Sequence, residues 1–285
     1  MRYLVLGDNN GLGLTVIKEI ELRGYEEIDY LSDDEIKEYS PKNLEAYIEK
    51  KHPDVVIDLY EDNNMERAET SDYTELDCYK TNVLMTKSIA EASERIGAKL
   101  IYLSTDQVYA GKKKDFNKET DNTDSLSVYG ATKITAEKEV MKNPKHFIVR
   151  PGMIYGGRHD IIDDLLWTRD PVMKGSLEVV SPVDINFLAS TMADMSYYDN
   201  YGIYNVADSG RCTIKEFLES VRNVYRRNIQ IVPADHIDYY VSPNRALNVD
   251  KLKENGYQKP SFWITSLAAF RKTNTPGYEK VLKKQ

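Results

Sequence analysis

A phenol and an ammonium stand four positions apart in the segment Tyr129-Gly130-Ala131-Thr132-Lys133. On a helix this spacing places both groups on one face. A phenol titrates at about pH 10, and a neighbouring cation lowers that pKa, so that the phenol becomes a useful acid at neutral pH. Such a pair suits a site where tyrosine protonates a carbonyl oxygen while a nicotinamide supplies hydride. Taken alone, however, the spacing favours an ordinary surface helix.

A second polar segment, Ser104-Thr105-Asp106, follows the apolar run 101–103 upstream of the pair. If that run is a strand, a hydroxyl at its carboxyl end can donate a hydrogen bond to the same carbonyl oxygen. The alternative is a polar strand-to-loop turn. The order of strand end, hydroxyl and Tyr-x-x-x-Lys helix favours a catalytic site.

A glycine-rich turn, Gly7-Asp8-Asn9-Asn10-Gly11-Leu12-Gly13, lies between the first expected strand and the first expected helix. Glycines there let a backbone approach a pyrophosphate at the helix N-terminus. Asn10 stands where this fingerprint usually has its middle glycine, and asparagine tolerates the left-handed conformation. The ribose-binding carboxylate is expected near Asp33 or Asp34, which leaves the choice between NADH and NADPH open.

Short β-rich runs alternate with helical segments through the first half of the chain, which predicts parallel β-α-β units. We therefore expect an α/β fold, a Rossmann-type doubly wound parallel sheet with a smaller C-terminal substrate lobe. The expected strands are 3–6, 27–31, 54–59, 99–104, 147–150 and 202–206, and the expected helices include 79–96 and 213–225.

The expected division places residues 1–156 in the dinucleotide-binding domain, with 184–208 returning to it. Residues 157–183 and 209–285 form the smaller lobe, in which 157–181 is expected to be irregular or helical. Thr213 should cap the helix 213–225, with Glu216 in the capping-box position.

Composition narrows the function classes. The formal net charge of −8 and the pI of about 5.2 argue against a nucleic-acid partner. Cys78 and Cys212 lack neighbours at ligand spacing, which argues against a metal site and fits a reducing compartment. No segment is typical of a signal peptide or a membrane span. We therefore expect a cytoplasmic protein without membrane contact.

These motifs together resemble the extended short-chain dehydrogenase/reductases, and within them the dTDP-4-dehydrorhamnose reductase family. The resemblance covers most of the chain. It rests on Gly7–Gly13, Pro53–Ile57, Ala68-Glu69, Asn82, Ser104–Tyr109, Tyr129–Lys133, Arg150, Tyr155-Gly156, 202–206, Pro243-Asn244, Leu247 and Lys251-Leu252.

The resemblance implies a catalytic triad of Thr105, Tyr129 and Lys133, with Asn82 helping to position the lysine. It implies NADPH or NADH as cofactor, a nucleotide-sugar substrate and, by analogy, a homodimer. The substrate would contact Thr105, Asp106 and Met153. The cofactor would contact Gly7, Asn9, Asn10, Gly11, Leu12, Gly13, Leu59, Tyr60, Asn82, Ser104, Tyr129 and Lys133.

The chain departs from the family pattern in three places. Asp58-Leu59-Tyr60-Glu61-Asp62-Asn63 replaces a segment of the Asn-Ala-Ala-Ala-Tyr-Thr type, whose small side chains let the backbone lie against the cofactor. Met153 replaces a tryptophan near the sugar, and Ser242 replaces an arginine. The altered glycine turn and the segment 58–63 put cofactor affinity in doubt, and the other changes leave the substrate open.

Three functions remain open. The first is an NAD(P)H-dependent reductase of a nucleotide-activated 4-keto-6-deoxysugar. The second is a nucleotide-sugar epimerase or dehydratase, although Gln107 cannot exchange a proton as the usual dehydratase glutamate does. The third is a non-catalytic regulatory subunit, like the beta subunit of methionine adenosyltransferase, which resembles the same branch. Arg158 and Arg245 could contact a substrate diphosphate or form ordinary surface salt bridges.

Overall fold

The computed structural model describes residues 1–24, 27–70, 72–234 and 240–282. A six-stranded sheet in the order β10-β5-β4-β3-β1-β2 forms its centre, and every neighbouring pair is parallel. This confirms the doubly wound α/β fold. The strands are β1 (Arg2–Leu6), β2 (Glu27–Leu31), β3 (Val55–Asp58), β4 (Lys99–Leu103), β5 (His146–Pro151) and β10 (Gly202–Val206).

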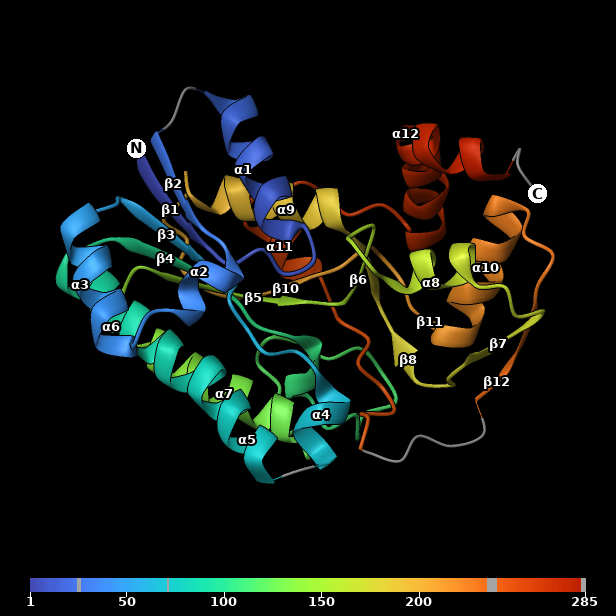
Figure 1. Ribbon diagram of the computed structural model, residues 1–285, viewed down its shortest axis with the longest axis horizontal. Helices are drawn as coiled ribbons and strands as arrows, with labels where there is room; N and C mark the ends of the chain where they lie inside the picture. Colours follow the sequence, from blue (N-terminus) through green and yellow to red (C-terminus); the bar gives the residue numbers. More distant parts are fainter. Residues whose placement is uncertain (25–26, 71, 235–239, 283–285) are drawn as a thin grey trace.

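Helices cover both faces of this sheet (Figure 1). Because strand side chains alternate between the faces, Tyr3 and Val5 enter one hydrophobic core while Leu4 and Leu6 enter the other. One face carries α1 (Leu12–Arg23) and α9 (Ile185–Met195), and the other carries α3 (Pro41–Lys51), α6 (Thr86–Arg95) and α7 (Val128–Val140). A short helix, α2 (Asp33–Lys37), follows β2.

The segment between β3 and α6 differs from the expected single helix 79–96. It forms α4 (Met65–Thr70), α5 (Asp72–Tyr79) and a π-helical turn, η1 (Lys80–Met85), before α6 begins. A π-turn inserts one extra residue into a helix and often marks a functional position. Here the turn buries Asn82 completely. After β4, the residues Asp106–Val108 form a 3-10 turn, η2.

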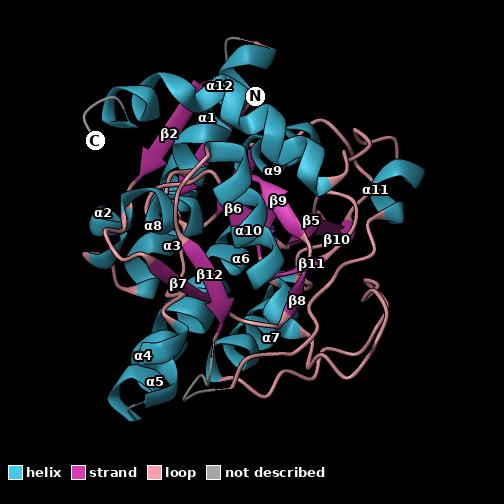
Figure 2. Cartoon of the chain, turned by 90° about the vertical axis from the view of Figure 1, so that its right-hand side faces the viewer, coloured by secondary structure: helices cyan, strands magenta, loops and turns pink. Residues whose placement is uncertain are grey.

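The smaller part of the chain lies beyond the carboxyl ends of the sheet strands (Figure 1), and it faces the viewer in Figure 2. Strands β7 (Val172–Gly175) and β12 (Gln230–Pro233) pair in parallel, β6 (Met153–Tyr155) pairs with β9 (Pro182–Asp184), and β8 (Val179–Val180) pairs with β11 (Cys212–Thr213). The interpretation of 157–181 as irregular or helical is therefore incomplete. The helices of this part are α8 (Ile161–Trp167), α10 (Ile214–Tyr225) and α12 (Trp263–Leu282), whereas α11 (Asp250–Glu254) packs against β10 of the large sheet.

Helix α10 has the predicted capping box, because the Thr213 side chain accepts from the Glu216 backbone while the Glu216 side chain accepts from the Thr213 backbone. Both tryptophans belong to this smaller part. Trp263 is buried against Phe217, with ring centroids 6.0 Å apart, whereas Trp167 ends α8 with 55% of its surface exposed.

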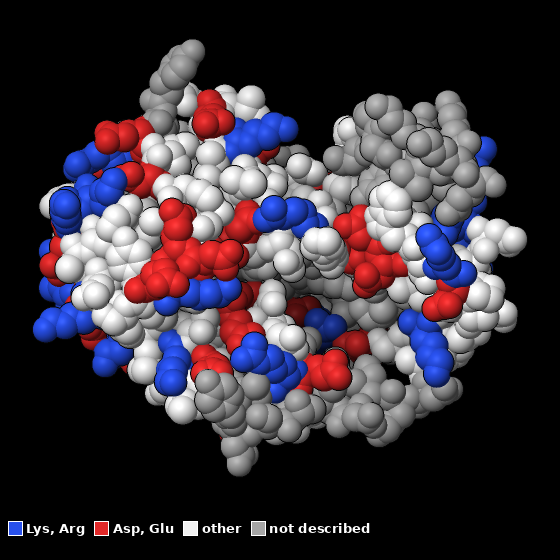
Figure 3. Space-filling view, in the orientation of Figure 1, with Lys and Arg blue, Asp and Glu red and all other residues white. Residues whose placement is uncertain are grey.

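The molecule is hollowed between its larger and smaller parts (Figure 3). The sheet edge that carries the carboxyl ends of the strands faces this hollow, which is where open α/β sheets bind ligands. Strand β10 lies beside β5 in the large sheet, although it comes late in the chain. Across the part of the chain that the structure describes, no helix is both long and apolar enough to cross a membrane.

Candidate active site

The turn after β1 keeps the backbone shape of a dinucleotide-binding loop. Gly7, Asn9, Asn10 and Gly11 all have positive φ, at 83°, 39°, 57° and 101°. A Cβ atom on Gly13 would lie 2.5 Å from the Gly7 carbonyl oxygen, so only glycine permits this close contact between β1 and α1. Asparagine therefore takes the left-handed conformation at position 10, as the sequence indicated.

The chain's own charged groups occupy the start of α1. The Leu14 N–H donates to the Asp8 carboxylate over 3.3 Å, and Arg158 forms an ion pair with that carboxylate. The Arg158 backbone N–H also donates to the Asn10 carbonyl over 2.7 Å. Arg158 thus lies across the glycine turn, where a guanidinium is well suited to meet phosphate oxygens.

Tyr129 and Lys133 lie on α7, close to the loop that follows β4. Ser127 caps the start of this helix, and its hydroxyl accepts from the Gly130 N–H over 3.0 Å. A Cβ on Gly130 would lie 2.5 Å from the Gln107 carbonyl oxygen, so this glycine lets the helix approach the loop. Both side chains are buried, with Tyr129 5% and Lys133 1% exposed.

A third residue, Glu61, joins the pair. Its Oε2 accepts from the Tyr129 hydroxyl over 3.0 Å and from Lys133 Nζ over 2.7 Å. Lys133 also donates to the Leu103 carbonyl over 2.7 Å and lies 4.5 Å from the centre of the Tyr102 ring. Lys133 and Tyr129 are thus on one helix face, as predicted, but both point at a carboxylate that the sequence did not single out.

The Glu61 carboxylate reverses the expected titration of the phenol. Burial raises the pKa of Tyr129, and the negative charge of Glu61 raises it further. Burial alone would lower the pKa of Lys133, but Glu61 and Tyr102 outweigh it and the pKa lies above its ordinary value. The expectation that Lys133 lowers the pKa of Tyr129 is therefore wrong for this arrangement, in which Tyr129 is a protonated phenol and Lys133 a cation.

Glu61 also contacts the glycine turn. The Asn9 side-chain amide donates to Glu61 Oε1 over 3.0 Å. Glu61 was visible in the sequence only as an acid within 58–63, where the family has small residues. That signal could have been noticed, but its partners Asn9 and Lys133 lie 52 and 72 positions away.

The polar residues after β4 divide between the site and the interior. Thr105 interacts with the Tyr129 phenol and accepts from the Gln107 N–H over 3.2 Å. Ser104 instead donates to the buried Glu137 over 2.6 Å. Asp106 is held by Arg245, as close as 3.0 Å, so Thr105 is the residue of this segment that joins the tyrosine.

Asn82 makes its described hydrogen bonds to the neighbours of Lys133 and Glu61 in the chain, so the predicted positioning of the lysine would be indirect. Its amide oxygen accepts from the Asp62 N–H over 2.8 Å, and its amide nitrogen donates to the Asp62 carbonyl over 3.0 Å and to Thr132 over 3.1 Å. The π-helical turn therefore fixes the loop after β3 beside α7, and with it the backbone next to Glu61.

The other predicted contact residues differ in accessibility. Tyr60 lines a cavity, while Met153 is half-buried on β6. Five predicted cofactor contacts expose 1% of their surface or less in this structure: Leu12, Leu59, Asn82, Ser104 and Lys133. No group of three or more potential metal ligands occurs among the described residues.

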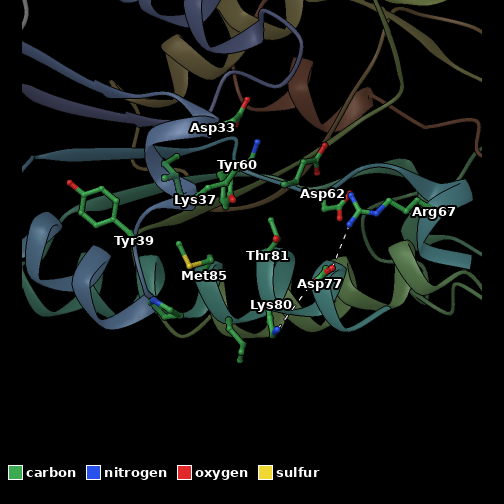
Figure 4. Close-up of a pocket in the computed structure, with 14 residues that line it drawn as sticks. Asp33, Lys37, Tyr39, Tyr60, Asp62, Arg67, Asp77, Lys80, Thr81 and Met85 are labelled. Carbon is green, nitrogen blue, oxygen red and sulfur yellow. Dashed lines mark hydrogen bonds and ion pairs between the residues drawn. The ribbon is translucent and has the colours of Figure 1, made fainter. Parts of the chain in front are cut away.

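A cavity of about 730 Å³ opens between α2 and the loop after β3 on one side and the helices α5 and η1 on the other (Figure 4). Asp33 and Tyr60 line its upper side, and Lys80 and Thr81 line its lower side. The Asp33 carboxylate also accepts from the Asp8 N–H over 3.3 Å, so the cavity adjoins the glycine turn. The close glycine cradle and this cavity fit the adenosine half of a dinucleotide. The other half requires the head of Lys133, which Glu61 binds.

Fold and site together define the short-chain dehydrogenase/reductase class, since the Tyr-x-x-x-Lys helix lies at the sheet edge toward which the glycine turn opens. Within that class the chain belongs to the family described as RmlD substrate binding domain, which matches residues 1–275.

Among similar proteins, a dTDP-4-dehydrorhamnose reductase of Sinorhizobium fredii is 27% identical over 92% of this chain and 94% of its own length. The spore coat polysaccharide biosynthesis protein SpsK of Bacillus subtilis is 27% identical over 77% of this chain and 78% of its own. A dTDP-4-dehydrorhamnose reductase of Salmonella typhimurium is 34% identical, but over only 42% of this chain and 39% of its own length.

Solved structures share the fold. A dTDP-4-dehydrorhamnose reductase from Clostridium acetobutylicum superimposes with a TM-score of 0.90 at 22% identity, covering 96% of this chain and 100% of that one. The corresponding Bacillus anthracis reductase, in complex with NADP, gives 0.89 at 21% identity, covering 96% and 99%.

Proposed function

We propose that this protein is an NAD(P)H-dependent reductase of a nucleotide-activated 4-keto-6-deoxysugar, as its relatives named dTDP-4-dehydrorhamnose reductase suggest. The observation that carries the proposal is the convergence of Thr105, Tyr129 and Lys133 at the carboxyl end of β4. A buried phenol, a hydroxyl and an ammonium at one point suit proton delivery to a ketone oxygen.

The glycine turn, the cavity beside Asp33 and Tyr60, and Lys133 would hold NADH or NADPH. The cofactor supplies hydride when bound. Asp33 is the first residue of α2, two positions after β2 ends, where a carboxylate binds a ribose 2′-hydroxyl and repels a 2′-phosphate. This supports NADH as the preferred form.

The chain's own residues supply the remaining chemistry. Tyr129 delivers its proton to the ketone oxygen, and Thr105 donates a hydrogen bond to the same oxygen. Lys133, held by the Leu103 carbonyl, stabilises the phenolate that Tyr129 leaves behind. Asp106 is paired with Arg245 in the interior, so it positions the loop and does not exchange protons.

We further propose that residues 1–156 with 184–208 bind the dinucleotide, while 157–183 and 209–285 cover the substrate, which Met153 of the first part would also contact. A cytoplasmic location fits the free, buried Cys78 and Cys212. A homodimer fits the exposed apolar residues Leu76, Tyr79 and Leu126 near α5 and the start of α7. Light scattering on the purified protein tests the dimer.

Two alternatives are distinguished by particular residues. A dehydratase needs an acid–base residue at position 107, and the buried Gln107 carries no titratable group. A non-catalytic binding subunit is favoured by one observation, the contact of Glu61 with both Tyr129 and Lys133.

The decisive experiment follows nicotinamide absorbance with the purified protein, NADH or NADPH, and a dTDP-4-keto-6-deoxyhexose. We expect substrate-dependent oxidation that falls by orders of magnitude in Tyr129→Phe, with cofactor affinity nearly unchanged. Full activity in Tyr129→Phe would exclude the mechanism. Cofactor binding without oxidation would favour epimerisation or another nucleotide sugar, and absence of any cofactor binding would favour the non-catalytic subunit.

A further inference from the structure

We propose that Glu61 is an internal competitor of the dinucleotide: its carboxylate occupies the hydrogen-bonding groups of Tyr129 and Lys133 that a bound nicotinamide riboside needs, and so sets cofactor affinity. The inference rests on the proposed function and adds a determinant of dinucleotide binding to it.

Glu61 lies where the loops after β1 and β3 diverge at the edge of the sheet. Strands β1 and β3 are neighbours, but the chain continues to opposite sides of the sheet from them, so their loops part at the carboxyl edge. Asn9 is on the loop after β1 and Glu61 on the loop after β3. Their hydrogen bond therefore bridges the crevice where doubly wound sheets hold dinucleotides.

The Glu61 carboxylate bonds to groups on both sides of this crevice. One carboxylate links the glycine turn, through Asn9 and Oε1, to the catalytic helix, through Lys133 and Oε2. A ligand that extends from the glycine turn to Lys133 must cross this link. Ribose hydroxyls would then have to replace a carboxylate 2.7 Å from the ammonium.

The ion pair between Glu61 and Lys133 is buried. The Glu61 side chain is 7% exposed and that of Lys133 1% exposed, so water screens their attraction weakly. Lys133 keeps the Leu103 carbonyl and the Tyr102 ring when Glu61 leaves. Asn82 bonds both the N–H and the carbonyl of Asp62, which holds the backbone next to Glu61 in place. The release of Lys133 therefore needs only a rotation of the Glu61 side chain.

The expected change in cofactor affinity depends on the fraction of the free protein in which Glu61 is bound to Lys133. If the arrangement with Glu61 on Lys133 makes up about 90–99% of the free protein, the apparent dissociation constant is raised by about 10- to 100-fold. Removing the carboxylate removes this competition.

The test is a binding titration, by calorimetry or fluorescence, of NADH and NADPH to wild type, Glu61→Ala and Glu61→Gln. We expect Glu61→Ala to bind the preferred dinucleotide at least about tenfold more tightly, with Glu61→Gln between it and wild type. Since Glu61→Ala leaves Lys133 without its carboxylate, the thermal midpoint of each variant is measured with and without dinucleotide. The ligand-induced rise should be larger in the variants.

Two controls separate this effect from others. ADP carries no nicotinamide riboside, so its affinity should rise clearly less than that of the preferred dinucleotide. Because Glu61 also lines the cavity and bonds to Asn9 of the glycine turn, a small gain from the lost charge is expected for ADP. Glu91→Ala, on α6, removes the same charge without touching Tyr129 or Lys133, and should bind dinucleotides like wild type.

Each result of the binding titrations supports or overturns the inference. Dinucleotide binding that tightens clearly more than ADP binding supports the inference, and an equal gain for both overturns it. Equal or weaker dinucleotide binding in a folded Glu61→Ala, while wild type binds the cofactor, overturns the inference and leaves the reductase proposal intact. If no variant binds NADH, NADPH or ADP, both proposals fall.

Discussion

Arg245 and Asp106 are 139 positions apart in sequence, yet the guanidinium Nη1 lies 3.0 Å and 3.2 Å from the two carboxylate oxygens. The other terminal nitrogen, Nη2, donates to Glu178 over 2.6 Å. Only 10% of the Arg245 side chain is exposed, so the interpretation as a surface salt bridge is wrong. Arg245 instead joins the loop after β4 to the smaller part of the protein.

Arg245→Ala should therefore destabilise the fold strongly. The substitution leaves the Asp106 and Glu178 carboxylates without their shared cation in a poorly solvated region, which costs about 3–5 kcal/mol. Urea unfolding followed by circular dichroism measures this loss. Arg222→Ala is the control, because this half-buried arginine on α10 donates only to the neighbouring Asn223 amide oxygen among the bonds described. A loss below about 1 kcal/mol in Arg245→Ala would contradict the prediction.

Asp33 should determine the choice between the two dinucleotides. Its carboxylate lines the cavity, so a 2′-phosphate placed there would meet a like charge. We expect NADH to bind more tightly than NADPH, and Asp33→Ser to reduce that ratio on the order of tenfold. Asp34→Ser is the matched control, because Asp34 is the adjacent acid and is exposed rather than lining the cavity, although its partner Lys37 does line it. An unchanged ratio in Asp33→Ser would assign discrimination elsewhere.

Asp58 should make stability depend on pH. The carboxyl group is fully buried at the end of β3, and burial raises its pKa from 3.8 to about 7, although the nearby Lys133 opposes this and Glu61 adds to it. Between about pH 4 and pH 7 the folded state therefore holds a proton that the unfolded state has released. The contribution of Asp58 to stability falls as pH rises through this window, and the full penalty applies above about pH 7.

Asp58→Asn removes that penalty and keeps an oxygen that can accept from the Tyr60 N–H. Relative to wild type, the variant should gain on the order of 1–3 kcal/mol at pH 8, and this gain should shrink toward pH 4. Urea titrations of both proteins at several pH values give the comparison. A difference that does not vary with pH would show that Asp58 ionises as it does in the unfolded chain.

Asn82→Asp should loosen the loop after β3. The carboxylate can still accept from the Asp62 N–H, but it cannot donate to the Asp62 carbonyl or to Thr132. Loss of these buried bonds should cost about 1–3 kcal/mol. Hydrogen exchange at the backbone of residues 59–64 should accelerate more than in β1. Equal protection in the two proteins would mean that Asn82 does not hold this loop.

Local patterns predicted the fold well where the signal lay within a few residues. The apolar run of β1, the glycine turn after it and the capping box of Thr213 and Glu216 all depend on near neighbours, and the structure contains each of them. The π-helical turn was missed because its cause is tertiary: it buries Asn82 against Asp62 and Thr132.

The candidate site was predictable in its residue types but not in its connections. Tyr129, Lys133 and Thr105 come together as their spacing and order suggested. The partner that changes their titration, Glu61, belongs to another loop and is joined to them only by sheet topology. A sequence motif names the groups that can react, whereas the pKa of each group depends on charges that arrive from distant segments.

The placement of both tryptophans in the smaller part gives the protein a built-in optical label. The six-stranded sheet and its flanking helices contain tyrosines but no indole among the residues described, while Trp263 is buried and Trp167 is half exposed. Indole emission therefore reports on the region around α8 and α12, and circular dichroism reports on the whole chain. Unfolding curves that coincide in both signals would mean that the two parts melt as one unit, and curves that separate would give the stability of each part on its own.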